Sequence, residues 1–152
     1  LYILIRFRKW QFSLGAVVAL LHDVLFVMGV FSLADGFLPF QLEVDQAFIA
    51  AILTVIGYSL NDTVVVFDRI RENMGSRGKQ NGVSINKSLN QTLSRTFNTS
   101  LTTFFVLLVI FLFGGEVIRG FMFALLLGVL VGTYSSLFIA TPVMFDASDK
   151  ES

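Results

Sequence analysis

Four long stretches of apolar residues, separated by polar segments, dominate the pattern along the chain. They cover residues 12–33, 46–67, 93–113 and 117–144, each boundary being good to several residues. Each stretch approaches the roughly 20 residues that an α-helix needs to cross about 30 Å of hydrocarbon. The stretches are continuous and do not alternate with polar residues, which favours helices over strands. The pattern therefore predicts an all-α, polytopic membrane bundle of four spanning helices.

The polar segments suggest three divisions of the chain. Residues 1–10 are predicted to be the cytoplasmic end of a preceding span, residues 11–145 the four-span bundle, and residues 146–152 a cytoplasmic tail. The bundle contains a long polar loop at 68–92, in which glycines and polar residues at 75–82 favour a turn and Ser84 is a candidate N-cap for the next helix. Because the chain begins with Leu1 and not with Met, we expect a fragment of a longer protein.

Lysine and arginine gather in alternate connections. The segment before the first apolar stretch holds three of them, and the 68–92 loop holds Arg69, Arg71, Arg77, Lys79 and Lys87. The 34–45 connection has none, and Arg119 is the only one near the last turn. Positively charged loops remain on the cytoplasmic side of a membrane. We therefore expect both chain ends and the 68–92 loop to be cytoplasmic.

The composition excludes several functional classes. Apolar residues make up 55% of the chain and charged residues only 14%, whereas soluble domains carry about 25% charged residues. The net charge is zero and no basic cluster is interleaved with aromatics, so nucleic acid is not an expected partner. With no cysteine and a single histidine, we expect no metal site and no cofactor other than protons as the coupling ion. No nucleophile–base set is present, which disfavours a membrane-embedded hydrolase and an enzyme in general.

Apart from Arg119, which lies at the start of the last stretch, three charged residues fall inside the apolar stretches: Asp23, Asp62 and Arg95. A charge at mid-bilayer costs roughly 2.5–3.5 kcal/mol on insertion scales, so such residues need partners and are functional candidates. At about 1.5 Å per residue, Asp62 lies roughly 9 Å inside the helix end marked by Asp68. Arg95 has a similar depth on the next, antiparallel helix. We therefore expect Asp62 and Arg95 to meet.

Polar side chains extend this pair into two stripes at helical spacing. One stripe is Thr54, Tyr58 and Asp62, with Asn61 beside it, and the other contains Gln91, Arg95, Asn98, Thr99 and Thr102. Facing stripes would form a hydrated seam in which Arg95 moves toward or away from Asp62 and so controls its binding of a proton. This interpretation predicts a proton relay. A static ion pair that fixes helix register is the alternative.

Asp23 is a weaker candidate, and we assign it a supporting polar role. Adjacent helix residues point about 100° apart, so we do not expect His22 and Asp23 to serve one site. Asp23 instead shares a face with Ala16 and Ala19, which suits helix contact. A small residue also recurs at every fourth position of the last stretch, which predicts close approach of another helix; these residues are Ala124, Gly128, Gly132, Ser136 and Ala140.

Two longer motifs resemble a known family. Residues 55–73 read VIGYSLNDTVVVFDRIREN and residues 88–96 read SLNQTLSRT. Together with ALLHDV at 19–24 and GVFSL at 29–33, they are similar in order and spacing to SecF of the SecD/SecF family of protein-export membrane proteins. The resemblance covers almost the whole chain. It leaves open whether the parent is a separate SecF or the C-terminal half of a SecD–SecF fusion.

The resemblance implies a fold and a function. The fold would be similar to the membrane domain of resistance–nodulation–division transporters, in the bacterial cytoplasmic (inner) membrane. The function would be that of a Sec translocon accessory subunit that uses the proton-motive force to promote preprotein export. SecD, the SecYEG channel and preproteins would be its partners, besides membrane lipid. The resemblance assigns the intramembrane acid to Asp62 and its basic partner to Arg95.

Two other functions remain open at this point. A proton-coupled exporter of small molecules or lipids, from the same superfamily, would share the architecture but would need a substrate pocket outside these spans. A passive scaffold subunit would use Asp62 and Arg95 only to set helix register.

Overall fold

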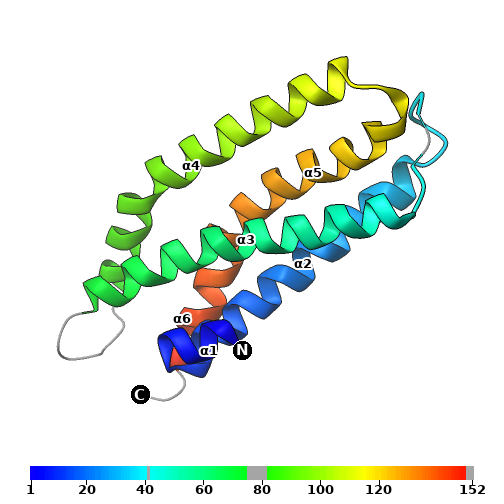
Figure 1. Cartoon of the computed structure of the whole chain (residues 1–152). Coiled ribbons are helices and arrows are strands. Elements are labelled where there is room, and N and C mark those ends of the chain that lie inside the picture. Colours follow the sequence, from blue (N-terminus) through cyan, green and yellow to red (C-terminus); the bar gives the residue numbers. More distant parts are fainter. Residues whose placement is uncertain (41, 75–81, 150–152) are drawn as a thin grey trace.

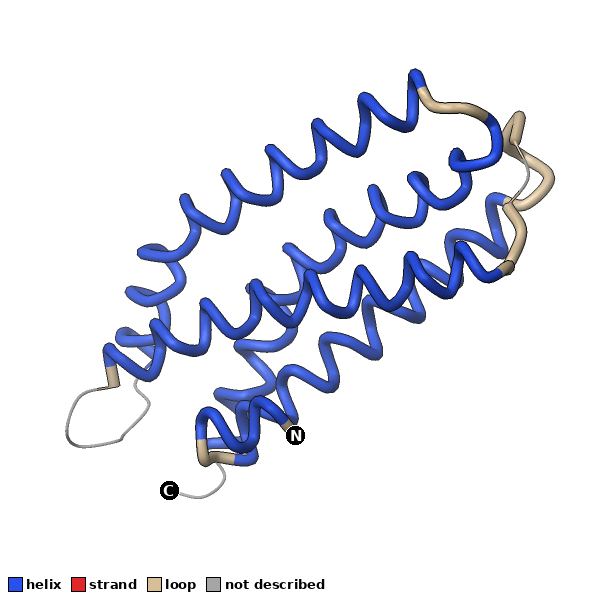
Figure 2. Tube along the Cα trace, viewed as in Figure 1, coloured by secondary structure: helices blue, strands red, loops and turns tan. Residues whose placement is uncertain are grey.

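The chain folds into long helices that run side by side along one direction (Figures 1 and 2). The computed structural model describes residues 1–40, 42–74 and 82–149, and within these ranges it contains helices and no strand. The all-α prediction is confirmed. In chain order the elements are α1 (Tyr2–Phe7), α2 (Trp10–Ala34), α3 (Gln46–Asn73), α4 (Gly82–Phe113), α5 (Glu116–Ser135), the π-helix η1 (Ser136–Ala140) and α6 (Thr141–Asp149).

Four helical stretches of the described chain are long and apolar enough to cross a membrane. They are α2, α3, α4 and the continuous run Glu116–Ser148. The predicted four spans are confirmed, and the protein is a multi-pass membrane protein. Both α3 and α4 continue past their apolar parts into the predicted 68–92 loop. α4 is already helical at Gly82, so Ser84 lies inside the helix and the prediction that Ser84 is its N-cap is wrong. The predicted turn at 75–82 lies, except for Gly82, outside the described residues.

The two ends of the bundle differ in what they hold. The N-terminus, the end of α3, the start of α4 and the last helix lie at one end, and the α2–α3 and α4–α5 connections lie at the other (Figure 1). This arrangement agrees with the alternation of positive charge in the sequence. The side of the membrane on which each end lies, and the division at residue 10, stay predictions.

The first helix folds against the end of the bundle. It ends at Arg8, whose φ of 55° is left-handed and reverses the chain into α2. Ile3 and Phe7 are buried, and the Phe7 ring stacks on Phe12 with centroids 5.0 Å apart. Both rings also meet the edge or face of Phe67 on α3. The apolar face of α1 thus fastens the start of α2 to α3.

Within the last span, predicted over 117–144, the hydrogen-bonding pattern of the helix changes for one turn. This turn is η1, which lies between α5 and α6 and ends two residues before Pro142. Proline has no backbone N–H and removes one helical hydrogen bond, and π-helical structure occurs mostly as single turns of this kind within α-helices. The Thr141 hydroxyl donates to the Ser136 carbonyl across this turn at 3.2 Å. The helix continues to Asp149, so the first residues of the predicted tail are helical; residues 150–152 lie outside the described part of the chain.

The small residues of the fourth span pack as predicted. All five are buried, and Gly128 lies so close to Val55 of α3 that a side-chain carbon there would overlap it. A carbon added to Gly132 would lie 3.1 Å from Ser59 Cβ. On α2, Gly15 approaches the carbonyl of Ala140 in the same way. These close approaches place α5 centrally, against α2, α3 and α4.

Candidate functional site

Asp62 lies inside the bundle, at the meeting of α3, α4 and α5. Only 4% of its surface is exposed. Ser100 of α4 lies within hydrogen-bonding reach of its carboxylate. The Ser100 hydroxyl also accepts a hydrogen bond from Tyr58 Oη at 3.1 Å and lies 2.6 Å from Thr133 Oγ1 on α5. Three helices therefore contribute hydroxyl groups around one buried acid.

One oxygen of this acid remains available. Oδ2 of Asp62 is buried and has no hydrogen-bond partner among the described residues. An unpaired buried oxygen of this kind is costly unless a proton, water or another group binds it. Asp62 is therefore chemically equipped to take up and release a proton.

Arg95 lies on α4 near this acid, as predicted, but it is exposed. Its positive charge acts on Asp62, yet within the described residues the two groups form no ion pair as short as 4.0 Å. Arg95 instead lines a cleft of about 360 Å³ together with Asp68, Arg69 and Gln91. The Arg95 guanidinium therefore lies near enough to Asp62 for the two charges to interact, and it also lines the cleft at the polar end of the helices.

The remaining predicted residues do not converge on Asp62. Gln91 accepts hydrogen bonds from Arg69 Nε at 2.8 Å and from Asn73 Nδ2 at 3.0 Å, so it belongs to the polar end of α3 and α4. The hydroxyls of Thr99 and Thr102 donate to carbonyls of their own helix. Of the two predicted polar stripes, therefore, only Tyr58 and Asp62 lie in the interior together, and these three residues of α4 have other partners.

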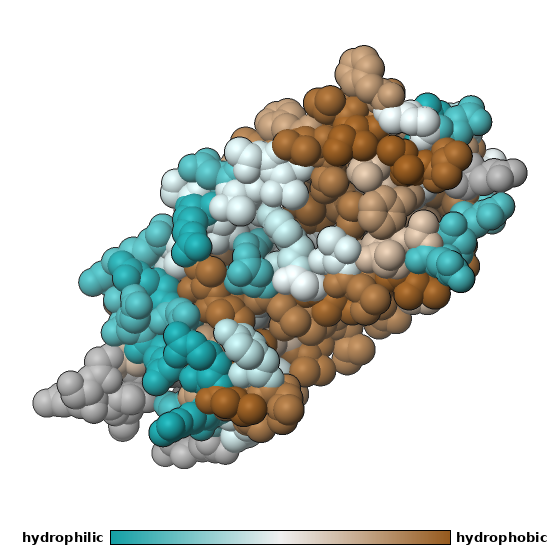
Figure 3. Space-filling model, viewed as in Figure 1, coloured by the Kyte–Doolittle hydropathy of each residue, from teal (hydrophilic) through white to brown (hydrophobic). Residues whose placement is uncertain are grey.

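A polar face is left on the outside of α3 and α4. Its members are exposed and lie within the apolar length of the bundle: Thr54, Asn61, Arg95, Asn98, Thr99 and Thr102. Figure 3 shows pale and teal atoms reaching from the polar end far along the molecule, between brown regions. Polar side chains inside a membrane face protein or water and not lipid. This face is suited to contact with further protein.

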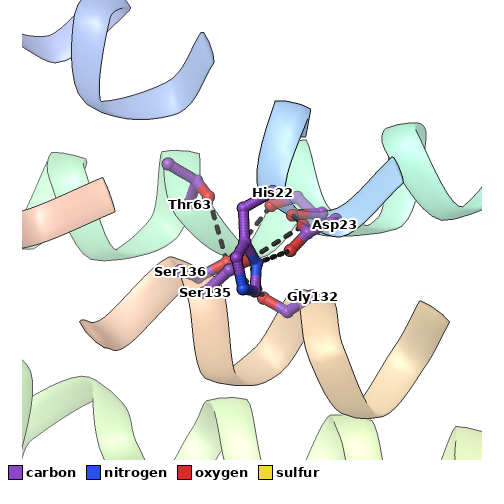
Figure 4. Close-up of polar contacts among 7 residues, drawn as sticks. His22, Asp23, Thr63, Gly132, Ser135 and Ser136 are labelled. Atoms are coloured by element: carbon purple, nitrogen blue, oxygen red, sulfur yellow. Dashed lines mark hydrogen bonds and ion pairs between the residues drawn. The ribbon is translucent and has the colours of Figure 1, made fainter. Parts of the chain in front are cut away.

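Asp23 has more partners than its supporting role in the sequence suggested. It is completely buried, and its Oδ2 accepts hydrogen bonds from Ser59 of α3 at 2.6 Å and from Ser135 of α5 at 2.8 Å. His22 Nδ1 lies 3.2 Å from Asp23 Oδ1 (Figure 4). The expectation that His22 and Asp23 serve no common site is wrong, because the side chains turn toward each other although their Cα–Cβ bonds diverge.

Hydroxyl groups to which the sequence assigned no polar role complete the interior. Thr63 Oγ1 lies 3.0 Å from Ser136 Oγ, and Ser136 also donates to the Gly132 carbonyl at 2.7 Å. Ser59, Ser100, Thr133 and Ser135 were missed as well. Their only signal was the presence of small hydroxyl residues within apolar stretches, which fit helix packing equally well.

Comparison with known families decides the relationship. The family described as "Protein export membrane protein SecD/SecF, C-terminal" matches residues 1–150. The chain belongs to the SecD/SecF family. Within this family, the protein translocase subunit SecF of Rhodothermus marinus is 62% identical over 146 residues, covering 95% of this chain and 47% of the relative. SecF of Thermodesulfovibrio yellowstonii is 52% identical over 147 residues, covering 95% and 46%.

The fold agrees with a solved SecD/SecF structure. The crystal structure of SecDF in its super-membrane-facing form matches 99% of this chain and 20% of its own, with a TM-score of 0.88 and 41% identity. The chain thus spans about half the length of the curated SecF relatives it matches and a fifth of that SecDF chain. The helices described above correspond to the part of each of these proteins that matches this chain.

Proposed function

We propose that this chain is the proton-binding membrane portion of a Sec translocon accessory subunit. The subunit uses the proton-motive force to promote preprotein export across the bacterial cytoplasmic membrane. The observation that carries the proposal is Asp62, a buried carboxylate with an unpaired oxygen and with Arg95 close by on an adjacent helix. Membership of the SecD/SecF family supports the transport role.

The coupling step follows from the charges at Asp62. An ionised Asp62 attracts the Arg95 guanidinium, and a protonated Asp62 does not. Because Arg95 is exposed along α4, loss of this attraction frees its side chain and the adjacent turns of α4 to shift. Proton uptake from one side of the membrane and release to the other would then drive α4 back and forth against α3 and α5. No resident cofactor enters this scheme, in which the proton is the coupling ion.

The partners in this proposal come from the rest of the export machinery. A SecD half or subunit covers the polar face of α3 and α4, which supplies the protein contact that intramembrane polar residues need. The SecYEG channel and the preprotein are engaged by parts of the parent outside this chain. Both chain ends and the α3–α4 connection face the cytoplasm, where Arg6, Arg71 and Lys87 agree with the positive-inside rule.

The decisive experiment replaces Asp62 by Asn in the full-length parent. The variant should insert and assemble normally and lose the part of preprotein export that depends on the proton-motive force. Asp68→Asn is the matched control, because Asp68 lies two turns further along the same helix and is partly exposed. Unchanged proton-driven export in the Asp62 variant would contradict the proposal. If the same variant lost efflux of a small molecule or lipid and kept normal secretion, the exporter function would replace it.

Substitution of Arg95 separates charge from shape. Arg95→Lys keeps the positive charge and loses the planar guanidinium, whereas Arg95→Gln loses both. We expect partial export with lysine and none that is proton-driven with glutamine. A passive scaffold, in which the pair only sets register, would leave export intact in any variant that still assembles.

A further inference from the structure

A second buried acid, Asp23, lies apart from the hydroxyl cluster around Asp62. It is fully buried at the contact of α2, α3 and α5, and three side chains from those helices lie against its two oxygens. Figure 4 shows His22, Asp23 and Ser135 of this group lying among the helices. Two serine hydroxyls already satisfy Oδ2, so the carboxylate would be anchored between the helices without any contribution from His22.

His22 adds a feature that a purely structural anchor does not require. Its side chain is 37% exposed, while Asp23 beside it is 0% exposed. The ring packs near Phe26 and Tyr134, with centroids 6.1 Å and 6.4 Å away. With hydrogen on Nδ1, the ring donates to Asp23 Oδ1 and leaves Nε2 as a proton acceptor. The half-exposed imidazole therefore connects a fully buried carboxylate with the surface of the bundle.

The surroundings of the pair contain few other groups that titrate. α5 presents Tyr134 and Ser135, α3 presents Ser59 with Asp62 one turn further along, and η1 presents Ser136. α1 and α6 pack near the start of α2, where the charged side chains described are Arg6, Arg8, Lys9 and Asp146.

We propose that His22 and Asp23 form a second proton-binding site. The half-exposed imidazole accepts a proton at Nε2 and passes its Nδ1 proton to Oδ1 of the buried Asp23. The N–H bond at Nδ1 breaks as the O–H bond forms, so the ring ends neutral with its hydrogen on Nε2. The pair gains one proton, and its net charge changes from −1 to 0 as the carboxylate becomes a carboxylic acid.

Proton binding here acts on two of the helices that surround Asp62, namely α3 and α5. An ionised Asp23 accepts strong hydrogen bonds from both serine hydroxyls, and a protonated Asp23 accepts weaker ones. The hydrogen bonds that join α2 to α3 and α5 therefore weaken when the pair takes up a proton. The proton-binding step stands by itself, and its use in export rests on the proposed function.

Infrared difference spectroscopy of the full-length parent in lipid nanodiscs tests the step directly. Spectra recorded across a pH series follow the carbonyl stretch that a carboxylic acid shows only when protonated. We expect Asp62→Asn to remove one band and Asp23→Asn to remove a different one. His22→Gln should keep the Asp23 band and shift its pH midpoint, because Oδ1 loses its proton-exchanging partner. Tyr134→Phe, which keeps the ring and removes only the hydroxyl, is the matched control and should leave that midpoint unchanged.

The outcomes distinguish this inference from the proposed function. An Asp23→Asn spectrum that superimposes on that of the unsubstituted protein would overturn it. Should Asp23→Asn fail to fold, the His22→Gln variant decides, because His22 is half exposed and its substitution should be tolerated. An Asp23 band with an unshifted pH midpoint in that variant would also overturn the inference. If Asp62→Asn leaves export proton-driven, the proposed function fails and the Asp23 band still decides the fate of the second site.

Discussion

Thr133 and Ser135, two residues apart on α5, point toward two different buried acids, Asp62 and Asp23, on different sides of that helix. Thr133 lies 2.6 Å from Ser100, which reaches Asp62, and Ser135 donates to Asp23 at 2.8 Å. Two residues rotate a helix by about 200°, so the hydroxyls point to nearly opposite faces. The last turn of α5 therefore separates these two carboxylates just before the helix changes to the π-form at Ser136.

The close contact of α5 with α3 depends on glycine at position 128. In Gly128→Ala the new methyl group would overlap Val55, and overpacking of this kind costs roughly 1–3 kcal/mol. We expect a lower melting temperature of the purified parent in detergent. Gly29→Ala, where nothing lies within 4 Å, is the control and should melt normally. Val55→Ala should restore part of the loss when combined with Gly128→Ala, and failure of this rescue would argue against the contact.

The serines around Asp23 should matter more for stability than their size suggests. Ser59→Ala and Ser135→Ala each remove one donor from a buried carboxylate, which costs about 1–3 kcal/mol. The stability that the double variant loses should differ from the sum of the losses of the two single variants, because both hydroxyls donate to the same oxygen. Thermal unfolding of the four proteins measures this coupling. Ser148→Ala, whose hydroxyl bonds only a carbonyl of its own helix, is the control; strictly additive losses would count against a shared acceptor.

The length of the apolar stretches was enough to predict the four spans, because crossing hydrocarbon imposes a length that sequence displays directly. The small residues of the last stretch predicted its close packing, because small side chains allow another helix to approach. The arrangement of the site was harder to predict. Depth along a helix placed Asp62 and Arg95 on facing spans, but depth alone does not reveal that Arg95 is exposed or that Ser100 also lies beside the acid.

The Asp23 cluster shows why the rest could not be predicted. Its partners Ser59 and Ser135 are separated from it by 36 and 112 residues, and no spacing rule connects them. The contact of His22 with Asp23 depends on side-chain rotamers, which helical periodicity does not specify. The π-helical turn at Ser136–Ala140 depends on how one span accommodates Pro142 while it packs against α2.

The exposed ion pair at the polar end should contribute little. Arg6 and Asp68 lie 3.1 Å apart with 45% and 36% of their side chains exposed. Exposed pairs contribute about 0–1 kcal/mol and are screened by salt. Arg6→Gln should therefore lower unfolding stability by less than about 1 kcal/mol. Phe67→Ala, which opens a hole between Phe7 and Phe12, should cost more, and the opposite order in thermal melts would contradict this account.

Ser100 is the hydroxyl that connects Asp62 with both neighbouring helices, so its removal should affect proton coupling before it affects assembly. Ser100→Ala leaves Tyr58 Oη and Thr133 Oγ1 without their shared partner and removes the polar group beside the acid. A hydrogen bond to a charged group contributes about 1.5–3 kcal/mol, so proton-driven export should slow by on the order of tenfold or more. Tyr58→Phe keeps the Ser100–Thr133 contact and should slow export less. Export rates from vesicles with an imposed proton gradient, compared with rates without one, measure the difference. Equal proton-driven rates in Ser100→Ala and the unsubstituted protein would mean that Asp62 works without this hydroxyl.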